Sequence, residues 1–237
     1  MLCPRGACTL VLLRHGHSEW NLTDRFTGWT DIPLTETGLA EATDAGQRLA
    51  RAGYAFDEVH ISVLQRTRQT AEKLLQAMGT PNLPIFATWR LNERHYGALQ
   101  GLNKKEIFAT WGEQESRKWW RGYYAPPPPV ALDDPRHPRF DPLYTDLPPA
   151  DLPASESLSD CQRRTLPYWN EVLAPRLRQG KRLLVISHGN TLRGLVMHLE
   201  RLSAEAMEHV EIPSGVPLVY CLSEGMEVMT KAWLKPA

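Results

Sequence analysis

The chain has 237 residues with 27 basic and 27 acidic side chains, so its formal net charge is zero. This balance indicates neither nucleic acid nor an acidic membrane as a partner, and an anionic ligand would need a local cluster of arginines to attract it. No apolar stretch approaches the length that spans a bilayer. We therefore expect a cytoplasmic protein with one α/β domain over residues 1–237.

The first half of the chain alternates between strand-like and helix-like segments. Three short runs are typical of strands: residues 9–13, 59–62 and 84–88. Two helices are expected between them, over residues 36–52 and 65–78. Thr35 is placed to cap the first helix and Gly53 to end it, whereas residues 15–34 are polar and turn-rich, which predicts a functional loop. This order predicts an α/β fold with a mostly parallel central sheet flanked by helices on both faces.

A proline-rich segment divides the second half. Residues 125–153 hold ten of the 19 prolines, which cannot donate ladder hydrogen bonds and favour irregular or polyproline structure. We expect an ordered cap insertion over the active site, and an SH3-type ligand or a disordered loop are the alternatives. The other expected elements are helices over 103–111, 157–177 (kinked or divided at Pro167 and Pro175), from about 191, and 204–210, and strands over 182–186, 217–222 and 227–233.

Two short motifs end apolar runs. Arg14-His15-Gly16 follows residues 9–13, and Ser187-His188-Gly189-Asn190 follows residues 182–186. Both runs are predicted to be buried parallel strands, and ligands bind beyond the carboxyl ends of such strands. Two imidazoles, an arginine and two flexible turns would then meet at one anion-sized place, which suits capture of a phosphoryl group on a histidine.

Longer motifs identify a family. Four segments carry the resemblance: RHGHSEWNLTDRFTGWTDIPLTETG at 14–38, LNERHYGALQGLNK at 91–104, SHGNTLRGLV at 187–196 and PSGVPLVY at 213–220. Together they resemble the cofactor-dependent phosphoglycerate mutases of the histidine phosphatase superfamily. The resemblance implies interconversion of 3-phosphoglycerate and 2-phosphoglycerate, primed by 2,3-bisphosphoglycerate, without a metal. Such proteins often form homodimers or homotetramers.

Five residues are the expected catalytic groups. His15 would be the nucleophile, since a neutral imidazole nitrogen can attack phosphorus and leave again. Arg14 and Arg66 would surround the phosphoryl group and oppose protonation of the nucleophile. The resemblance implies that His188 hydrogen-bonds the phosphoryl group and that Glu93 exchanges a proton with the substrate hydroxyl. A plain surface salt bridge to the neighbouring Arg94 is the alternative role for this glutamate.

The expected substrate-binding residues come from the same motifs. They are Asn21, Thr27, Gly28, Arg94, Tyr96, Lys104, Arg121, Gly189 and Asn190. The last two begin a helix, whose free N–H groups can bind an anion.

Two positions depart from the family pattern. Members usually have glutamate at position 17 and arginine at position 120, whereas this chain has His17 and Trp120. The histidine removes an anion near the phosphate site and forms a conceivable metal pair with His15, although no further ligands are evident. Arg117 and Lys118 are the neighbouring cations that could replace the missing guanidinium. Packing under the cap is the alternative role of the tryptophan.

Two other functions remain open in the sequence. A histidine phosphatase would use the same core residues with water as acceptor, and a non-catalytic binding module would hold a phospholigand without turnover. Residues 91–104 favour the mutase. The four cysteines, Cys3, Cys8, Cys161 and Cys221, show no CxxC or zinc spacing and are interpreted as free thiols in a reducing compartment. Oxidation could join the first two of them.

Overall fold

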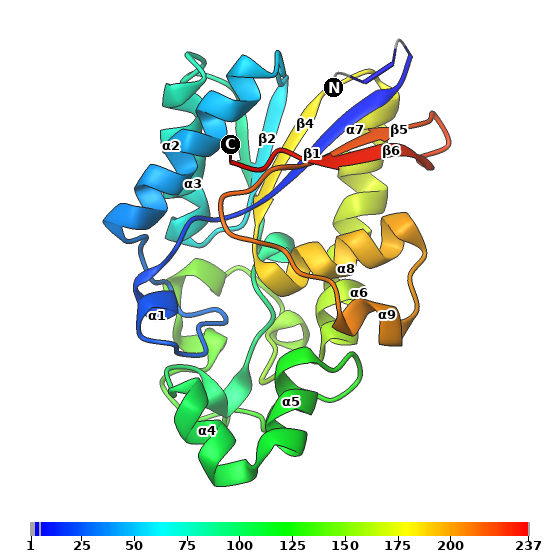
Figure 1. Ribbon diagram of the computed structural model, residues 1–237. Helices are drawn as coiled ribbons and strands as arrows, with labels where there is room; N and C mark the ends of the chain where they lie inside the picture. Colours follow the sequence, from blue (N-terminus) through cyan, green and yellow to red (C-terminus); the bar gives the residue numbers. More distant parts are fainter. Residues whose placement is uncertain (1–2, 5, 237) are drawn as a thin grey trace.

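A six-stranded sheet forms the centre of the computed structural model, which describes residues 3–4 and 6–236 (Figure 1). Its strands lie in the order β3-β2-β4-β1-β5-β6. Their bounds are β1 Cys8–Arg14, β2 Glu58–Ile61, β3 Ile85–Ala87, β4 Leu183–Ser187, β5 Leu218–Leu222 and β6 Val228–Trp233. The first four pair in parallel, and β5 runs antiparallel to both of its neighbours. The expected mostly parallel sheet is thereby confirmed.

Helices cover both faces of this sheet. Leu10 and Leu12 of β1 face a cluster that includes residues of η6 (Trp169–Leu173), α7 (Ala174–Arg178) and α8 (Gly189–Glu200). Tyr168, at the end of α6 (Leu158–Tyr168), packs against this cluster. Val11 and Leu13 face the opposite cluster, which includes α2 (Glu36–Arg51) and α3 (Gln65–Ala77). Successive side chains of a strand point to opposite faces, so a continuous apolar run is what a doubly covered strand requires.

The remaining helices are short. They are α1 Glu19–Leu22, α4 Lys104–Trp111, α5 Glu113–Arg121, α7 Ala174–Arg178, α9 Ala204–Glu208 and the 3₁₀ turns η1 Trp89–Leu91 and η2 Gly97–Leu99. The helix expected over 157–177 is divided into α6 and α7 by a π-helical stretch, η6 (Trp169–Leu173). Helices α1 and α5 were not expected. Figure 1 shows α4 and α5 beyond the carboxyl ends of the parallel strands. None of the helices among the described residues is long and apolar enough to cross a membrane.

The proline-rich segment is ordered by hydrogen bonds. It contains three 3₁₀ turns, η3 Pro138–Phe140, η4 Pro142–Tyr144 and η5 Pro149–Asp151. The carbonyl of Pro128 accepts a hydrogen bond from the Ala98 amide at 2.8 Å, and that of Pro127 accepts one from Ser155 Oγ at 2.7 Å. Tyr144 is 2% exposed, and its hydroxyl lies 2.9 Å from Asn92 Nδ2. These contacts fit neither a free SH3 ligand nor a disordered loop.

The cysteines pair differently from the expectation. Cys3 and Cys221 form a disulfide, whereas Cys8 and Cys161 are free and buried. The two bonded residues are 218 positions apart in the chain. They meet because β5 pairs with β1 near the start of the chain, placing Cys221 opposite Thr9. Neither the interpretation as four free thiols nor a Cys3–Cys8 bond was right, since the pairing depends on sheet topology.

Candidate active site

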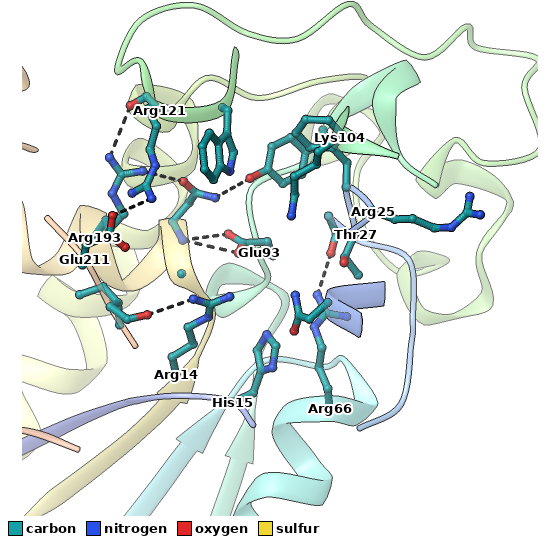
Figure 2. Close-up of a pocket in the computed structure, with 18 residues that line it drawn as sticks. Arg14, His15, Arg25, Thr27, Arg66, Glu93, Lys104, Arg121, Arg193 and Glu211 are labelled. Carbon is teal, nitrogen blue, oxygen red and sulfur yellow. Dashed lines mark hydrogen bonds and ion pairs between the residues drawn. The ribbon is translucent and has the colours of Figure 1, made fainter. Parts of the chain in front are cut away.

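A cavity of about 150 Å³ opens at the carboxyl ends of β1 and β4 (Figure 2). It is lined by Arg14, His15, Asn21, Arg25, Phe26, Thr27, Gly28, Arg66, Glu93, Tyr96, Lys104, Trp120, Arg121, Gly189, Asn190, Arg193, Glu211 and Ile212. The structure thus brings together all the expected site residues except His188 and Arg94. Some of them come from loops that follow the strands and others from the helices that those loops enter, as expected for an open α/β sheet.

His15 lies at the base of this cavity, directly after β1. Its amide donates to the carbonyl of Ser187 at 3.0 Å, which joins the two sequence motifs. Its ring Nδ1 lies 2.7 Å from the carbonyl of Gly16. A carbonyl can only accept, so Nδ1 carries the proton and Nε2 keeps a free lone pair. Burial, with the positive charges of Arg66 and Arg14, holds the pKa of His15 well below its ordinary value.

His188 lies beneath the cavity and contacts His15 through its ring. The ring centroids are 4.9 Å apart, and His188 is fully buried. Its Nδ1 accepts a hydrogen bond from Arg66 Nε at 3.2 Å, so its Nε2 donates to Ser62 Oγ at 2.8 Å. Burial, followed by the charge of Arg66, lowers the pKa of His188 as well. In this arrangement His188 orients Arg66 and does not line the cavity itself.

Arg66 is held by the main chain as well as by His188. Its NH1 and NH2 atoms donate to the carbonyls of Thr30 at 2.9 Å and Gly28 at 2.8 Å. These bonds leave two of its five N–H groups for a ligand. Burial lowers the pKa of Arg66 to about 10, so the guanidinium stays charged at neutral pH. Arg14 donates to the carbonyl of Ile212 at 3.0 Å, while its buried Nε has no partner.

Glu93 faces the cavity and is fixed by two backbone amides. Its Oε1 accepts from the Arg94 amide at 2.8 Å and from the Asn190 amide at 3.1 Å. The second bond places the carboxylate at the amino end of α8, where the helix dipole favours negative charge. The Arg94 side chain points elsewhere and donates to the carbonyls of Trp119 and Trp120 at 2.7 and 3.0 Å. The alternative role, a surface salt bridge between Glu93 and Arg94, is therefore wrong.

Arg94 was expected to bind the substrate directly, but it does not line the cavity. It is fully buried, and its guanidinium lies 4.6 Å from the centre of the Tyr96 ring. Its Nε and NH1 atoms have no hydrogen-bond partner. The residue therefore backs the wall of the cavity without lining it.

Arg193, Asn190 and Tyr96 form a series of hydrogen bonds along one wall of the cavity, and Arg193 was not expected there. Arg193 NH1 donates to Asn190 Oδ1 at 3.1 Å, so the Asn190 amide group faces Tyr96 and Nδ2 donates to its hydroxyl at 3.0 Å. The Tyr96 proton is then free for a ligand. The sequence did contain a signal for Arg193, because it follows Asn190 by three residues on α8 and residues with this spacing are neighbours on a helix. Arg25, Phe26, Glu211 and Ile212 also line the cavity and were not expected.

The rim of the cavity carries cations that are paired with carboxylates. Lys104 Nζ lies 2.8 Å from Asp24 Oδ1, and Arg121 NH2 lies 2.7 Å from Glu211 Oε1. The Arg121 guanidinium also stacks 4.6 Å from the centre of the Trp120 ring. The expected substitutes for a guanidinium at position 120 are elsewhere, since Arg117 and Lys118 are more than half exposed and pair with carboxylates of their own helix. Neither lines the cavity, so that hypothesis was wrong.

His17 does not line the cavity either. Its amide donates to Glu41 Oε2 at 2.8 Å, and its carbonyl accepts from the Thr35 amide at 2.9 Å. Within residues 3–4 and 6–236, no group of three or more His, Cys, Asp or Glu side chains is arranged to hold a metal ion. The effect of this histidine on a phosphorylated His15 stays a prediction.

Comparisons with known proteins agree with this fold. A family model described as histidine phosphatase superfamily (branch 1) matches residues 10–226. Two solved structures share the fold at 22% identity: Mycobacterial hydrolase 1, with a TM-score of 0.73 over 98% of this chain and 100% of that one, and a putative alpha-ribazole-5'-P phosphatase from Escherichia coli, with a TM-score of 0.68 over 92% of each.

Closer relatives narrow the family. A 2,3-bisphosphoglycerate-dependent phosphoglycerate mutase from Nitratidesulfovibrio vulgaris is 50% identical over 226 residues, which cover 95% of this chain and 91% of the relative. A protein of the same name from Hamiltonella defensa is 46% identical over 225 residues, covering 95% and 90%. The chain belongs to the histidine phosphatase superfamily and, within it, to the 2,3-bisphosphoglycerate-dependent phosphoglycerate mutases.

Proposed function

We propose that this protein is an isomerase that interconverts 3-phosphoglycerate and 2-phosphoglycerate and is primed by 2,3-bisphosphoglycerate. One observation carries the proposal. The unprotonated Nε2 of His15 belongs to a ring that lines a cavity also lined by Arg14, Arg66 and Glu93. A nucleophile, two cations and a carboxylate are the groups that a phosphoryl transfer between alcohols needs. The names of the relatives supply the substrate.

The transfer proceeds as two displacements at His15. In the first, Nε2 forms a bond to phosphorus while the P–O bond to the donor breaks, and the leaving oxygen takes a proton from Glu93. In the second, Glu93 takes a proton from the hydroxyl that attacks phosphorus, and the N–P bond breaks. Arg14 and Arg66 stabilise the charge on the transferring group, and each contributes about a few kcal/mol of electrostatic stabilisation in a site of this kind.

The cavity fits a ligand with several negative charges. Its lining includes six cations, Arg14, Arg25, Arg66, Lys104, Arg121 and Arg193, against the two carboxylates Glu93 and Glu211. Because the cations outnumber the carboxylates, the charge of the lining favours an anionic ligand. Arg14 and Arg66 would hold the phosphoryl group near His15, while Arg121 and Lys104 lie on the rim for the rest of the molecule.

A second candidate function is that of a phosphatase, which would use the same core residues and transfer the phosphoryl group to water. Trp120 favours it, because position 120 lacks the second guanidinium that would hold an intermediate during reorientation. Phosphorus NMR separates the two functions. With 3-phosphoglycerate and a trace of 2,3-bisphosphoglycerate, a mutase produces 2-phosphoglycerate, and omission of the bisphosphate slows the reaction. Release of inorganic phosphate without 2-phosphoglycerate would overturn the proposal in favour of the phosphatase.

A further inference from the structure

The segment that carries Glu93 is irregular, yet it must hold a carboxylate in place. Residues 89–95 include only the turn η1 before the chain continues without helix or strand. Four carbonyls of this segment accept hydrogen bonds from one side chain, the guanidinium of Arg164 on α6. That side chain is 6% exposed, and Arg164 does not line the cavity.

The contacts of Arg164 span both sides of Glu93. Its NH1 lies 3.1 Å from the carbonyl oxygen of Trp89 and 2.9 Å from that of Arg90. Its NH2 lies 3.2 Å from the carbonyl oxygens of both Asn92 and Glu93. A planar guanidinium presents its donors in a fixed fork, which a lysine cannot reproduce. The main chain at the catalytic carboxylate is therefore tied to one rigid cation.

Glu156 completes the clamp. Its carboxylate oxygens lie 2.7 Å from Arg164 Nε and 3.0 Å from NH2, and the pair is buried. The same carboxylate accepts from the His95 amide at 2.8 Å, and the Glu156 amide donates back to the His95 carbonyl at 2.9 Å. This ion pair therefore contacts the main chain both just before and just after Glu93. It shares the Glu93 carbonyl with Trp29, whose Nε1 donates to the same oxygen at 2.7 Å.

We infer that Arg164, held by Glu156, is a positioning residue that sets the place of Glu93 for proton transfer. The inference rests on the proposed function, in which Glu93 is the acid and base. Because neither member of the pair lines the cavity, its influence passes through the main chain of residues 89–95. A reacting group displaced by about 1 Å can lose about 10²-fold in rate, so loss of the clamp should be measurable.

The test variant is Glu156→Met/Arg164→Met. Removing one partner alone would leave an uncompensated buried charge, whereas an apolar replacement of both is often neutral for stability. The matched control is Glu58→Met/Arg176→Met. That pair also contains a buried carboxylate, 3.6 Å from its arginine, but Glu58 begins β2 and so lies at the opposite end of the strands from the cavity. Thermal unfolding checks that both variants fold.

The readout is the rate of His15 phosphorylation from two donors. An alkyl donor, 2,3-bisphosphoglycerate, needs a proton on its leaving oxygen, whereas 4-nitrophenyl phosphate does not. In the double variant we expect labelling by the alkyl donor to fall by about 10²-fold and labelling by the aryl donor to change by less than about threefold. The control should retain both rates. An equal fall with both donors, or no fall, would overturn the inference.

Two outcomes need separate handling. If the wild type is labelled by neither donor, the proposed function fails, whatever the role of the clamp. If the double variant does not fold, Arg164→Lys takes its place, because it keeps the charge and loses the fork. Its ratio of alkyl to aryl labelling should fall by about tenfold, and an unchanged ratio would overturn the inference.

Discussion

The base and the rim of the cavity are built in different ways. At the base, His15 is 4% exposed and Arg66 1%, and both are held by main-chain carbonyls. At the rim, the side chains of Lys104 and Arg121 are about one-fifth exposed and are held by acidic side chains. The fold itself therefore fixes the groups proposed for phosphoryl transfer, while the contacts proposed for substrate can change by single substitutions. Trp120, on the rim, is such a change.

The largest expected effect comes from Glu93, which faces the cavity above His15 and Arg66. Glu93→Gln should lower mutase turnover by about 10²–10⁴-fold, the usual range for a positioned acid–base group. Labelling of His15 by 4-nitrophenyl phosphate should survive better, because its leaving group needs little proton help. Turnover is followed by product formation and labelling by intact-protein mass spectrometry. A folded variant with near-normal turnover would remove Glu93 from the mechanism.

At the rim, Trp120→Arg should strengthen binding. One regained charge-assisted contact is worth roughly 1.5–3 kcal/mol, which corresponds to a Michaelis constant for phosphoglycerate about ten- to a hundredfold lower. The ratio of mutase to phosphatase activity should also rise, because a better-held intermediate escapes hydrolysis.

Trp111→Arg is the matched control for that substitution. Trp111 is 53% exposed and lies outside the cavity, so the substitution adds the same charge without a contact to the substrate. Both variants are assayed at matched ionic strength, since salt screens exposed charges. If Trp120→Arg and the control behave alike, Trp120 is a packing residue.

The pH dependence of His15 labelling tests whether burial and the neighbouring arginines keep this ring neutral. Because the pKa of His15 is lowered, the ring stays neutral at pH values below 6.5, the ordinary pKa of a histidine. The rate of labelling by 4-nitrophenyl phosphate, corrected for ionisation of the donor, should therefore stay constant from about pH 8 to about pH 6. An unperturbed imidazole would lose about three-quarters of its neutral form over this range. A loss of that size would contradict the buried, cation-flanked nucleophile.

The smallest effect is expected from the partner of Arg121. Glu211→Gln removes a carboxylate that is 73% exposed, and such pairs contribute little. We expect the Michaelis constant to fall by no more than about threefold, because Arg121 is released toward an anionic ligand, and the change should vanish in high salt. A tenfold or greater rise would instead show that the pair positions Arg121 for binding.

The base was also the part that the sequence predicted best. The strands and the motifs that end them are local signals, so the place of His15 at the end of β1 followed from an apolar run alone. Helix α5 was missed because Gly112 precedes it without a side-chain cap, and its first turn is polar. Arg193, the Arg164–Glu156 clamp and the Cys3–Cys221 bond depend on how distant elements pack, and no local pattern encodes that.

Phosphorylation of His15 tests the central claim most directly. After incubation with 2,3-bisphosphoglycerate, intact-protein mass spectrometry should find one added phosphoryl group, labile in acid and stable in base as a phosphoramidate is. His15→Ala should show none. An unlabelled wild type, or a labelled alanine variant, would contradict the account.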